Sequence, residues 1–168
     1  LTVVGITADR IVTIGSPRFD VYTQIHNHRA ASLHSRSTLK ILCIYPDFSY
    51  GDGFDIYDIE MYMKCVADAL RRIPSAHLTI KLRGSRREAF CRRRTAEICK
   101  DIPYSIEKDV PLTKLFMQCD LVVSCYSTAI LEAMQSGVPT IMFAAIPFEC
   151  RFVREHFDQY LLHGALSV

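Results

Sequence analysis

The sequence has 168 residues, of which 49% are hydrophobic and 23% are charged, a composition typical of an ordinary globular domain large enough for a core. The net charge of +2 does not indicate a general nucleic-acid binder, and no apolar run reaches the roughly 18 residues of a membrane-spanning helix. We therefore expect a cytoplasmic protein without a nucleic-acid partner. Peripheral contact with the inner face of a membrane stays open.

Residues 1–37 differ in character from the rest of the chain. Short strand-like runs at 1–6 and 11–14 precede a Gly- and Pro-containing turn at 15–20, and residues 26–37 are rich in His, Asn, Arg and Ser. Because the sequence does not begin with Met, we expect Leu1 to be a cut point within a longer protein. We predict that 1–37 is an interdomain segment from a missing N-terminal domain, with a linker or mobile loop in its polar part.

From residue 38 onward, strand-like and helix-like patterns alternate. Strands are expected at 39–45, 77–82, 102–106, 121–123 and 140–143. Helices are expected at 56–73, 86–100, 111–118, 129–135 and 149–162. This alternation is typical of an α/β doubly wound parallel sheet, so we predict one Rossmann-like domain at 38–168. Its ligand site is expected beyond the carboxyl ends of the strands.

The seven cysteines carry little functional signal. No two are placed as in a C-x-x-C metal or redox motif, and their odd number argues against complete disulfide pairing. Several fall in predicted strands or on apolar helix faces, so we expect buried, reduced thiols. A catalytic cysteine is an alternative for which the sequence indicates no histidine partner.

The stretch 119–143 carries the clearest functional signal. Ser127 and Thr128 stand between a predicted buried strand and a helix, where an N-cap belongs, and Gly137 is typical of the position after a helix. Free backbone N–H groups at a helix start, with two hydroxyls beside them, can bind an anion. Glu132, one turn further along, could accept hydrogen bonds from a sugar diol. The alternative, a simple N-cap followed by a solvated Glu132, stays open at this point.

Further polar residues follow the carboxyl ends of other predicted strands. Asp47 follows the first strand, Lys81 and Arg83 lie at the end of the second, and Lys108 follows the third. Because parallel strands end at the same edge of a sheet, we expect these residues to converge with Ser127. Two cations at such an edge can bind a phosphate, and arginine can do so with two hydrogen bonds.

Several motifs resemble the C-terminal half of a GT-B glycosyltransferase. They are G-S-P-R-F-D at 15–20, a strand ending in K-L-R at 81–83, P-L-T-K-L-F-M-Q-C-D-L-V-V-S at 111–124 and S-T-A-I-L-E-A-M-Q-S-G-V-P-T-I at 127–141. The resemblance is closest to bacterial surface-polysaccharide transferases and the related glycerophosphotransferase-like proteins. It implies a protein with two Rossmann-like domains, of which the C-terminal one holds a nucleoside-diphosphate sugar.

The resemblance also implies roles for individual residues. Ser127 and Thr128 would hold the donor diphosphate, and Glu132 the ribose. Arg83 would neutralise the leaving phosphate, with Lys81 in reserve. The crevice around the base would be lined by Asp47, Ile106, Lys108, Val110 and Tyr126. Neither a metal nor a cofactor is implied, and the general base is expected in the missing N-terminal domain, so this fragment would bind donor without turnover.

The implied function is transfer of a sugar from a nucleoside-diphosphate donor to a saccharide or lipid-linked acceptor, in polysaccharide or glycoconjugate biosynthesis. Two alternatives share the fold and the donor site: a non-hydrolysing sugar-nucleotide 2-epimerase and a CDP-polyol phosphotransferase. A third is a non-catalytic domain that contacts an anionic surface through the run Arg92 to Arg94, where a solvated basic face is otherwise expected. Some relatives have H-P in place of Arg83-Gly84 and D-Y-S-S in place of residues 124–127, which leaves the identity of the donor open.

Overall fold

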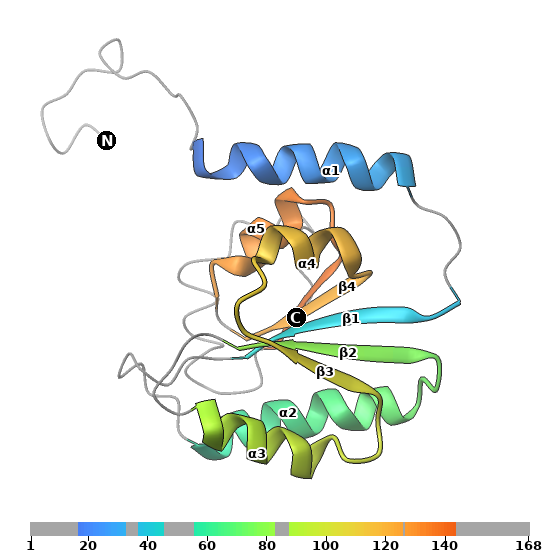
Figure 1. Cartoon of the computed structure of the whole chain (residues 1–168), viewed down its shortest axis with the longest axis vertical. Coiled ribbons are helices and arrows are strands. Elements are labelled where there is room, and N and C mark those ends of the chain that lie inside the picture. The colour runs from blue at the N-terminus through green and yellow to red at the C-terminus, as the bar shows by residue number, and fades with distance from the viewer. Residues whose placement is uncertain (1–16, 33–36, 46–55, 83–87, 126, 144–168) are drawn as a thin grey trace, which may run out of the picture.

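The computed structural model describes residues 17–32, 37–45, 56–82, 88–125 and 127–143, and these residues form a parallel sheet between two layers of helices (Figure 1). The strands in this part of the chain are β1 (Leu39–Ile44), β2 (Ala76–Lys81), β3 (Tyr104–Glu107), β4 (Leu121–Ser124) and β5 (Thr140–Met142). All neighbouring strands are parallel, in the order β3-β2-β1-β4-β5. The doubly wound Rossmann-like sheet predicted from the sequence is therefore confirmed.

Helices cover both faces of this sheet. They are α1 (Asp20–Ser32), preceded by the 3-10 turn η3 (Pro17–Phe19), then α2 (Ile56–Arg71), α3 (Glu88–Ile98), α4 (Leu112–Gln118) and α5 (Ala129–Gln135). Figure 1 shows α2 and α3 on one face, and α4, α5 and α1 on the other. None of the helices in the described part is long and apolar enough to cross a membrane. The helix expected at 149–162 and the strand-like runs at 1–14 lie outside the described residues.

The centre of the sheet is apolar on both faces. In β1, Ile41 and Cys43 belong to the core formed with α2 and α3, whereas Leu42 and Ile44 belong to the core formed with α1, α4 and α5. A strand that is buried on both faces lacks polar alternation, which is why the run at 39–45 is almost continuously apolar. The Tyr62 hydroxyl on α2 donates a hydrogen bond to the Val123 carbonyl oxygen at 3.0 Å, which satisfies the polar end of a fully buried ring.

The register of the strands places the last residue of each strand in one row. Ile44 pairs with Lys81 on one side and with Ser124 on the other, and Lys81 also pairs with Glu107. Because paired residues of parallel strands point to the same face, this row faces α1, α4 and α5 together with Ile44. The segments that carry the predicted ligand-binding residues therefore start from this row, at the carboxyl edge of the sheet.

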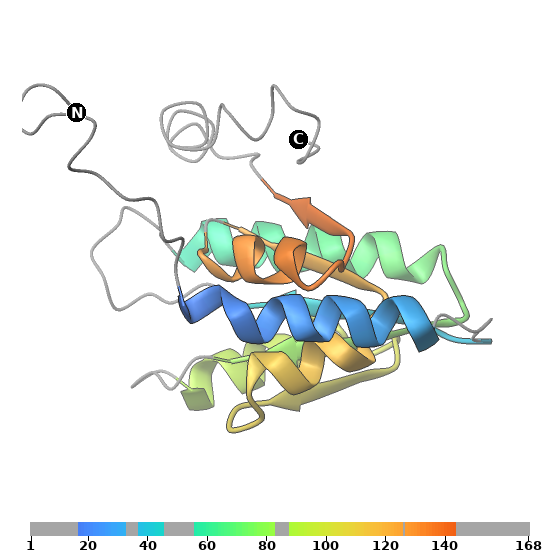
Figure 2. The same cartoon turned by 90° about the horizontal axis from the view of Figure 1, so that it is seen from above.

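The prediction of a polar linker or loop at 26–37 is wrong for its first part, because α1 continues to Ser32. The helix is polar on most of its surface, but Tyr22 and Ile25 are buried in the core shared with α4 and α5. Figure 2 shows α1 lying along these two helices. The boundary between residues 37 and 38 stays a prediction, although part of the segment before it contributes to the core.

Polar contacts hold α1 in place. Arg29 is only 8% exposed, and its Nη1 donates hydrogen bonds to the carbonyl oxygens of Phe116 and Cys119 at 2.5 and 2.6 Å. These carbonyls lie at the end of α4, where a helix leaves its last acceptors without an intrahelical partner. Thr23 on the same helix accepts a hydrogen bond from the Gln135 side chain of α5 at 2.8 Å.

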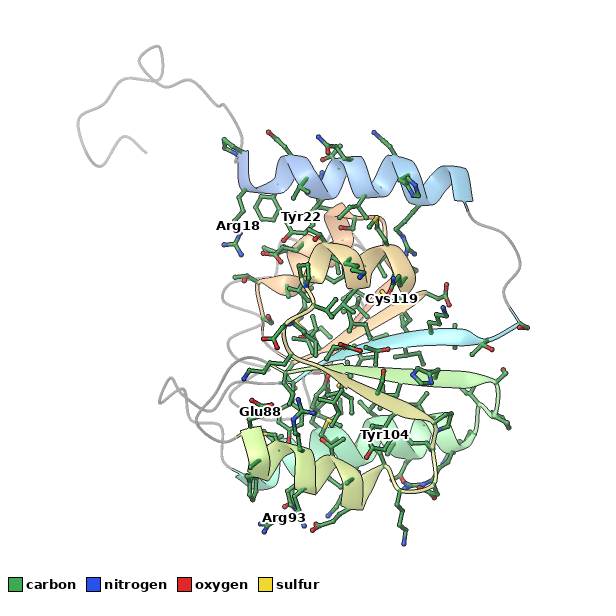
Figure 3. All side chains as sticks on the ribbon, in the orientation of Figure 1. Arg18, Tyr22, Glu88, Arg93, Tyr104 and Cys119 are labelled. Carbon is green, nitrogen blue, oxygen red and sulfur yellow. The ribbon has the colours of Figure 1, made fainter. Side chains whose placement is uncertain are left out.

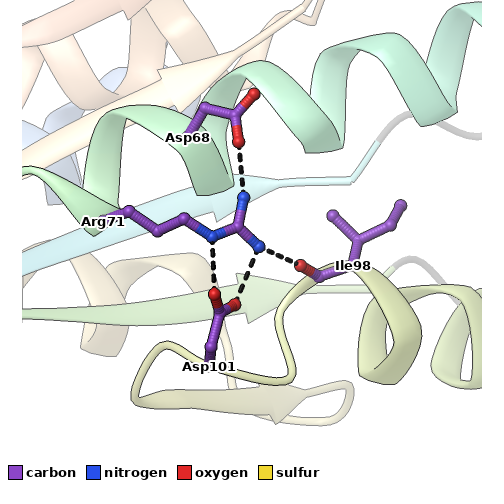
Figure 4. Close-up of polar contacts among 4 residues, drawn as sticks. All are labelled: Asp68, Arg71, Ile98 and Asp101. Atoms are coloured by element: carbon purple, nitrogen blue, oxygen red, sulfur yellow. Dashed lines mark hydrogen bonds and ion pairs between the residues drawn. The ribbon is translucent and has the colours of Figure 1, made fainter.

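A similar arginine joins the two helices of the opposite layer (Figure 4). At the end of α2, Arg71 donates to both carboxylate oxygens of Asp101, at 2.8 and 2.7 Å, and to the Ile98 carbonyl oxygen at 2.8 Å. Its remaining Nη1 contacts Asp68 within α2. Planar two-point pairing of this kind fixes geometry as well as charge, so the end of α2 is tied to the turn that follows α3.

We expect Arg29→Met to lower the free energy of unfolding by about 2–4 kcal/mol, because two buried carbonyl oxygens at the end of α4 would lose their charged donor. Urea denaturation monitored by circular dichroism measures this. His28→Met is the control, because His28 lies on the exposed side of the same helix. Equal stability of the two variants would contradict the integration of α1 into the core.

Candidate functional site

The predicted donor residues fall into two groups at the carboxyl edge of the sheet. One group lies on the turn after β4 and on α5 (Ser127, Thr128 and Glu132), and the other lies at the ends of β2 and β3 (Lys81 and Lys108). Because Lys81 and Ser124 flank Ile44 in the last row, and adjacent strands are about 4.8 Å apart, the two groups begin about 10 Å from each other. Three further predicted residues, Asp47, Arg83 and Tyr126, lie outside the described residues.

The N-cap of α5 lies where the sequence predicts it, but the side chain of the N-cap residue does not make the usual hydrogen bond to the helix. Thr128 is the N-cap residue, yet its side chain makes no capping bond and is exposed. The Ser127 Oγ instead accepts a hydrogen bond from the Ala129 backbone N–H at 3.2 Å. At the other end of α5, Gly137 has a φ of +68°, as predicted for a residue after the helix. An added Cβ there would clash with the His26 ring of α1, so this glycine also permits the close approach of α1.

Glu132 is not the solvated residue of the simpler alternative. It is 3% exposed, and its Oε1 forms an ion pair with Nη2 of Arg18, a residue of η3 whose side chain is 62% exposed. The Tyr22 hydroxyl donates a second hydrogen bond to the same carboxylate. Figure 3 shows Arg18 and Tyr22 side by side near the start of α1, at the end of the molecule where Glu88 begins α3. Glu132 is thus a buried carboxylate whose cationic partner is exposed.

The environment of Tyr22 reflects this contact. Burial of the ring, followed by the hydrogen bond to Glu132 and the negative charge of that residue, raises the pKa of Tyr22 to about 12, whereas the Arg18 guanidinium lowers it. A neutral Tyr22 hydroxyl is therefore a stable donor to the Glu132 carboxylate well beyond neutral pH.

The second group is centred on Lys81. Its ammonium donates a hydrogen bond to the Lys108 carbonyl oxygen, and burial lowers the pKa of Lys81 against the opposing effect of Asp109 and Glu107. The Lys108 ammonium points to Glu88, with an Nζ–Oε2 distance of 2.7 Å. These contacts tie the end of β2 to the segment after β3.

The Glu88 carboxylate joins Lys108 to the basic face of α3. Arg92 Nε lies 2.8 Å from the opposite oxygen of Glu88, and the hydrogen bonds from Lys108 and Arg92 hold the pKa of Glu88 below its usual value. Arg94 pairs with Glu60 of α2 and with Glu97. The charges of the predicted basic face are thus partly neutralised by neighbouring carboxylates.

Two residues that the sequence predicts to line the crevice pack against the core instead of lying beside Lys81. Ile106 packs against the core on the α2 and α3 side of the sheet, and Val110 packs against the core formed with α1 and α4. The six described cysteines are free thiols, of which only Cys65 is exposed. No cluster of three or more potential metal-binding side chains occurs among the described residues.

A polar cavity of about 220 Å³ lies elsewhere, between α4 and the sheet face of β1, β2 and β3. Its lining includes His77, whose Nε2 is 3.3 Å from the Ser105 Oγ, and Thr79, whose Oγ1 is 3.4 Å from the same oxygen. His77 is near the start of β2, away from the carboxyl edge, and none of the predicted donor residues that the structure describes lines this cavity.

Sequence reasoning missed Arg18 and Tyr22. Both belong to a segment interpreted as a linker, because the polar character of residues 26–37 obscures the helix. The sequence holds a weak signal: Phe19, Tyr22 and Ile25 recur on one side of a helix, but the next position on that side is Arg29. A charged residue on the buried stripe removes most of the amphipathic pattern.

No protein-family model and no curated protein matches this sequence. Among solved structures, the UDP-GlcNAc 2-epimerase from Neisseria meningitidis bound to UDP-GlcNAc matches with a TM-score of 0.61 and 12% identity, over 97% of this chain and 50% of that chain. MurG from Acinetobacter baumannii matches with a TM-score of 0.46 and 11% identity, over 78% and 37% of the two chains. The wall teichoic acid polymerase TagF, soaked with CDPG, matches with a TM-score of 0.45 and 13% identity, over 93% and 35%.

The likeness to the epimerase concerns the fold. This chain spans about half the length of that structure, and it has the Rossmann-like α/β fold of one half of a GT-B-type protein. The resemblance to a C-terminal GT-B domain, inferred from the motifs, is thereby confirmed at the level of the fold.

We expect the stabilising contribution of Tyr22 to be present below about pH 10 and to be lost as the pH rises toward 12, because the folded state holds its proton more tightly than the unfolded state does. The measurement is the free energy of unfolding of the unaltered chain and of Tyr22→Phe across this range. The difference between them should shrink with rising pH. Tyr104→Phe, on β3, is the control, and a constant difference for Tyr22→Phe would contradict the assignment.

Proposed function

We propose that the chain is the nucleotide-sugar donor-binding domain of a glycosyltransferase that acts in polysaccharide or glycoconjugate biosynthesis. The observation that carries the proposal is the Glu132 carboxylate, which is 3% exposed and lies in the first turn of α5 at the carboxyl edge of the sheet. This edge is where doubly wound sheets bind ligands. Glu132 is a buried charge whose cationic partner, Arg18, has a mostly exposed side chain, so this carboxylate is a candidate for binding rather than for packing.

The partner of Glu132 is suited to being replaced. Arg18 lies on a single 3-10 turn and its side chain is 62% exposed, so its guanidinium can leave Glu132 without disturbing the core. The freed carboxylate offers two oxygens, which match the two adjacent hydroxyls of a ribose. The fold is shared with an epimerase bound to UDP-GlcNAc, and this supports a nucleotide sugar as the ligand.

The diphosphate would lie between the two groups of predicted residues. The Thr128 hydroxyl has no capping bond and is exposed, and Ser127 is beside it. On the other side of β1, Lys81 supplies an ammonium, and Arg83 is the further cation assigned to this place. Cations aimed at the departing nucleoside diphosphate would stabilise the charge that develops as the sugar leaves. The acceptor, a saccharide or a lipid-linked saccharide, and the general base would belong to an N-terminal domain.

A sugar-nucleotide 2-epimerase is the second candidate, because the structure with a TM-score of 0.61 is an enzyme of that kind. It would use the same donor site but would need acid and base groups in the cleft between two domains. Product analysis by NMR on a longer protein that contains both domains separates the two functions. An epimerised nucleotide sugar without transfer to any acceptor would favour the epimerase.

We expect one of UDP, CDP, GDP or ADP to bind the chain in titration calorimetry, and Glu132→Gln to weaken that binding about 10- to 100-fold, through loss of charge-assisted hydrogen bonds. The introduced amide keeps the size of the side chain and can still accept a hydrogen bond from Tyr22.

The combined change Ser127→Ala and Thr128→Ala should weaken nucleotide binding by about 1–3 kcal/mol. Preferential binding of CDP would favour a polyol phosphotransferase, and that of UDP a sugar donor.

Glu97→Gln is the matched control for Glu132→Gln, because Glu97 is an exposed carboxylate on α3 that pairs locally with Arg94. Circular dichroism of each variant checks the fold. Unchanged affinity of Glu132→Gln would contradict the ribose assignment. Absence of binding by both this chain and a two-domain protein would contradict the donor-domain proposal itself.

A further inference from the structure

One sheet face lacks a cover in the described part of the chain. Leu121 and Val123 of β4, with Ile141 of β5 and the following Phe143, line an apolar groove of about 240 Å³ on the α2 side of the sheet. Ile141 is 45% exposed. Parallel sheets are covered on both faces, because their strands carry apolar side chains on both. On this side, α2 and α3 cover β1, β2 and β3, but no described helix lies over β5.

The neighbouring wall of the groove is a second apolar stripe on α2. The first stripe of this helix faces the core, but Met61, Cys65 and Ala69 recur at intervals of four residues on its exposed side, and the exposed Ile73 continues this spacing just after the helix ends at Arg71. Cys65, Ala69 and Ile73 line the groove. Residues spaced by four lie on one face of a helix, so this stripe is placed to contact another element packed beside α2.

The chain itself supplies a segment with the matching pattern. Residues 149–162 place Phe152, Val153, Phe157, Tyr160 and Leu161 within about half of the circumference of a helix, at about 100° per residue. The other half carries Arg151, Arg154, Glu155, Asp158 and Leu162. Within the first half, Glu149 and His156 separate Phe152 from the other four residues, which form a continuous apolar arc of about 100°, the width typical of a helix packed on a core.

We propose that residues 149–162 form a helix that docks by this apolar face in the groove between α2 and strands β4 and β5. The connection is short and starts in the right place, because Phe143 lines the groove and the five residues 144–148 reach at most about 17 Å. A helix of 14 residues is about 21 Å long, and Cys65 to Arg71, the last residue of α2, span about 9 Å along that helix, so the segment covers the groove. This packing does not depend on nucleotide binding.

Cys65 reports on the docking, because among the described residues it is the one exposed thiol and it lines the groove. Iodoacetamide labelling followed by peptide mass spectrometry measures its rate of alkylation in the chain of residues 1–168. We expect Phe157→Asp to speed this reaction about tenfold or more, as for a site exposed by undocking. Leu161→Asp should act in the same direction, whereas Leu162→Asp, the same chemical change about 100° around the helix, should have no effect.

A second measurement keeps the test informative if Phe157→Asp fails to fold. The chain has no tryptophan, so Phe157→Trp and Leu162→Trp each introduce a single tryptophan, whose emission can be excited apart from that of the eight tyrosines. We expect the Phe157→Trp variant to emit at shorter wavelength than the Leu162→Trp variant and to resist acrylamide quenching. Adding Ile141→Asp in the groove should remove this difference, whereas Val21→Asp on α1, at a similarly exposed apolar residue, should not.

Three results would overturn the proposal. Equal alkylation of Cys65 in the unaltered chain and in Phe157→Asp, with equal emission from the two tryptophan variants, would mean that the segment does not occupy the groove. Loss of Cys65 protection on dilution, together with a dimer in light scattering, would assign the groove to a second copy of the chain. Protection that appears only when anionic vesicles are added would assign it to a membrane surface.

Discussion

A parallel sheet with apolar side chains on both faces must be covered on both faces, and this constraint accounts for most of the architecture. All side chains from Ile41 to Ile44 in the central strand are buried. On one face α2 and α3 provide the cover. On the other, α4 and α5 have only seven residues each, and the longer α1 lies across them and contributes Tyr22 and Ile25 to the core. The segment before the predicted domain is therefore part of the cover.

The same helix connects the core to the candidate site. Near its end, Arg29 holds the carbonyl oxygens at the end of α4, and just before its start, Arg18 contacts Glu132. Tyr22 contacts both the core and the candidate site. Its ring packs against Phe116 at a centroid distance of 6.0 Å, and its hydroxyl donates to Glu132. Correct placement of α1 thus decides the environment of the buried carboxylate.

The positive charges on α3 and at the carboxyl edge of the sheet have different partners. On α3, Arg92 and Arg94 are engaged by Glu88, Glu60 and Glu97, and Arg93 lies over the Phe90 ring at 5.8 Å. Pairing of this kind reduces the net field that a membrane or a polymer would meet. At the carboxyl edge, by contrast, Lys81 donates to a neutral carbonyl oxygen, and the mostly exposed Arg18 side chain is paired with the buried Glu132.

The sequence by itself determined the fold class, the order of the strands and helices from residue 39 to residue 143, and the positions of Thr128 and Gly137 at the ends of α5. These features depend on local patterns, such as continuous apolar runs, helical spacing and the positive φ that glycine permits, which neighbouring residues decide. Tertiary structure alone decided that residues 20–32 form a helix of the core and that Glu132 is buried against Arg18 and Tyr22. Those contacts join residues that are far apart in the chain, and the buried stripe of α1 ends in a charged Arg29, whose partners are carbonyl oxygens that no sequence pattern reveals.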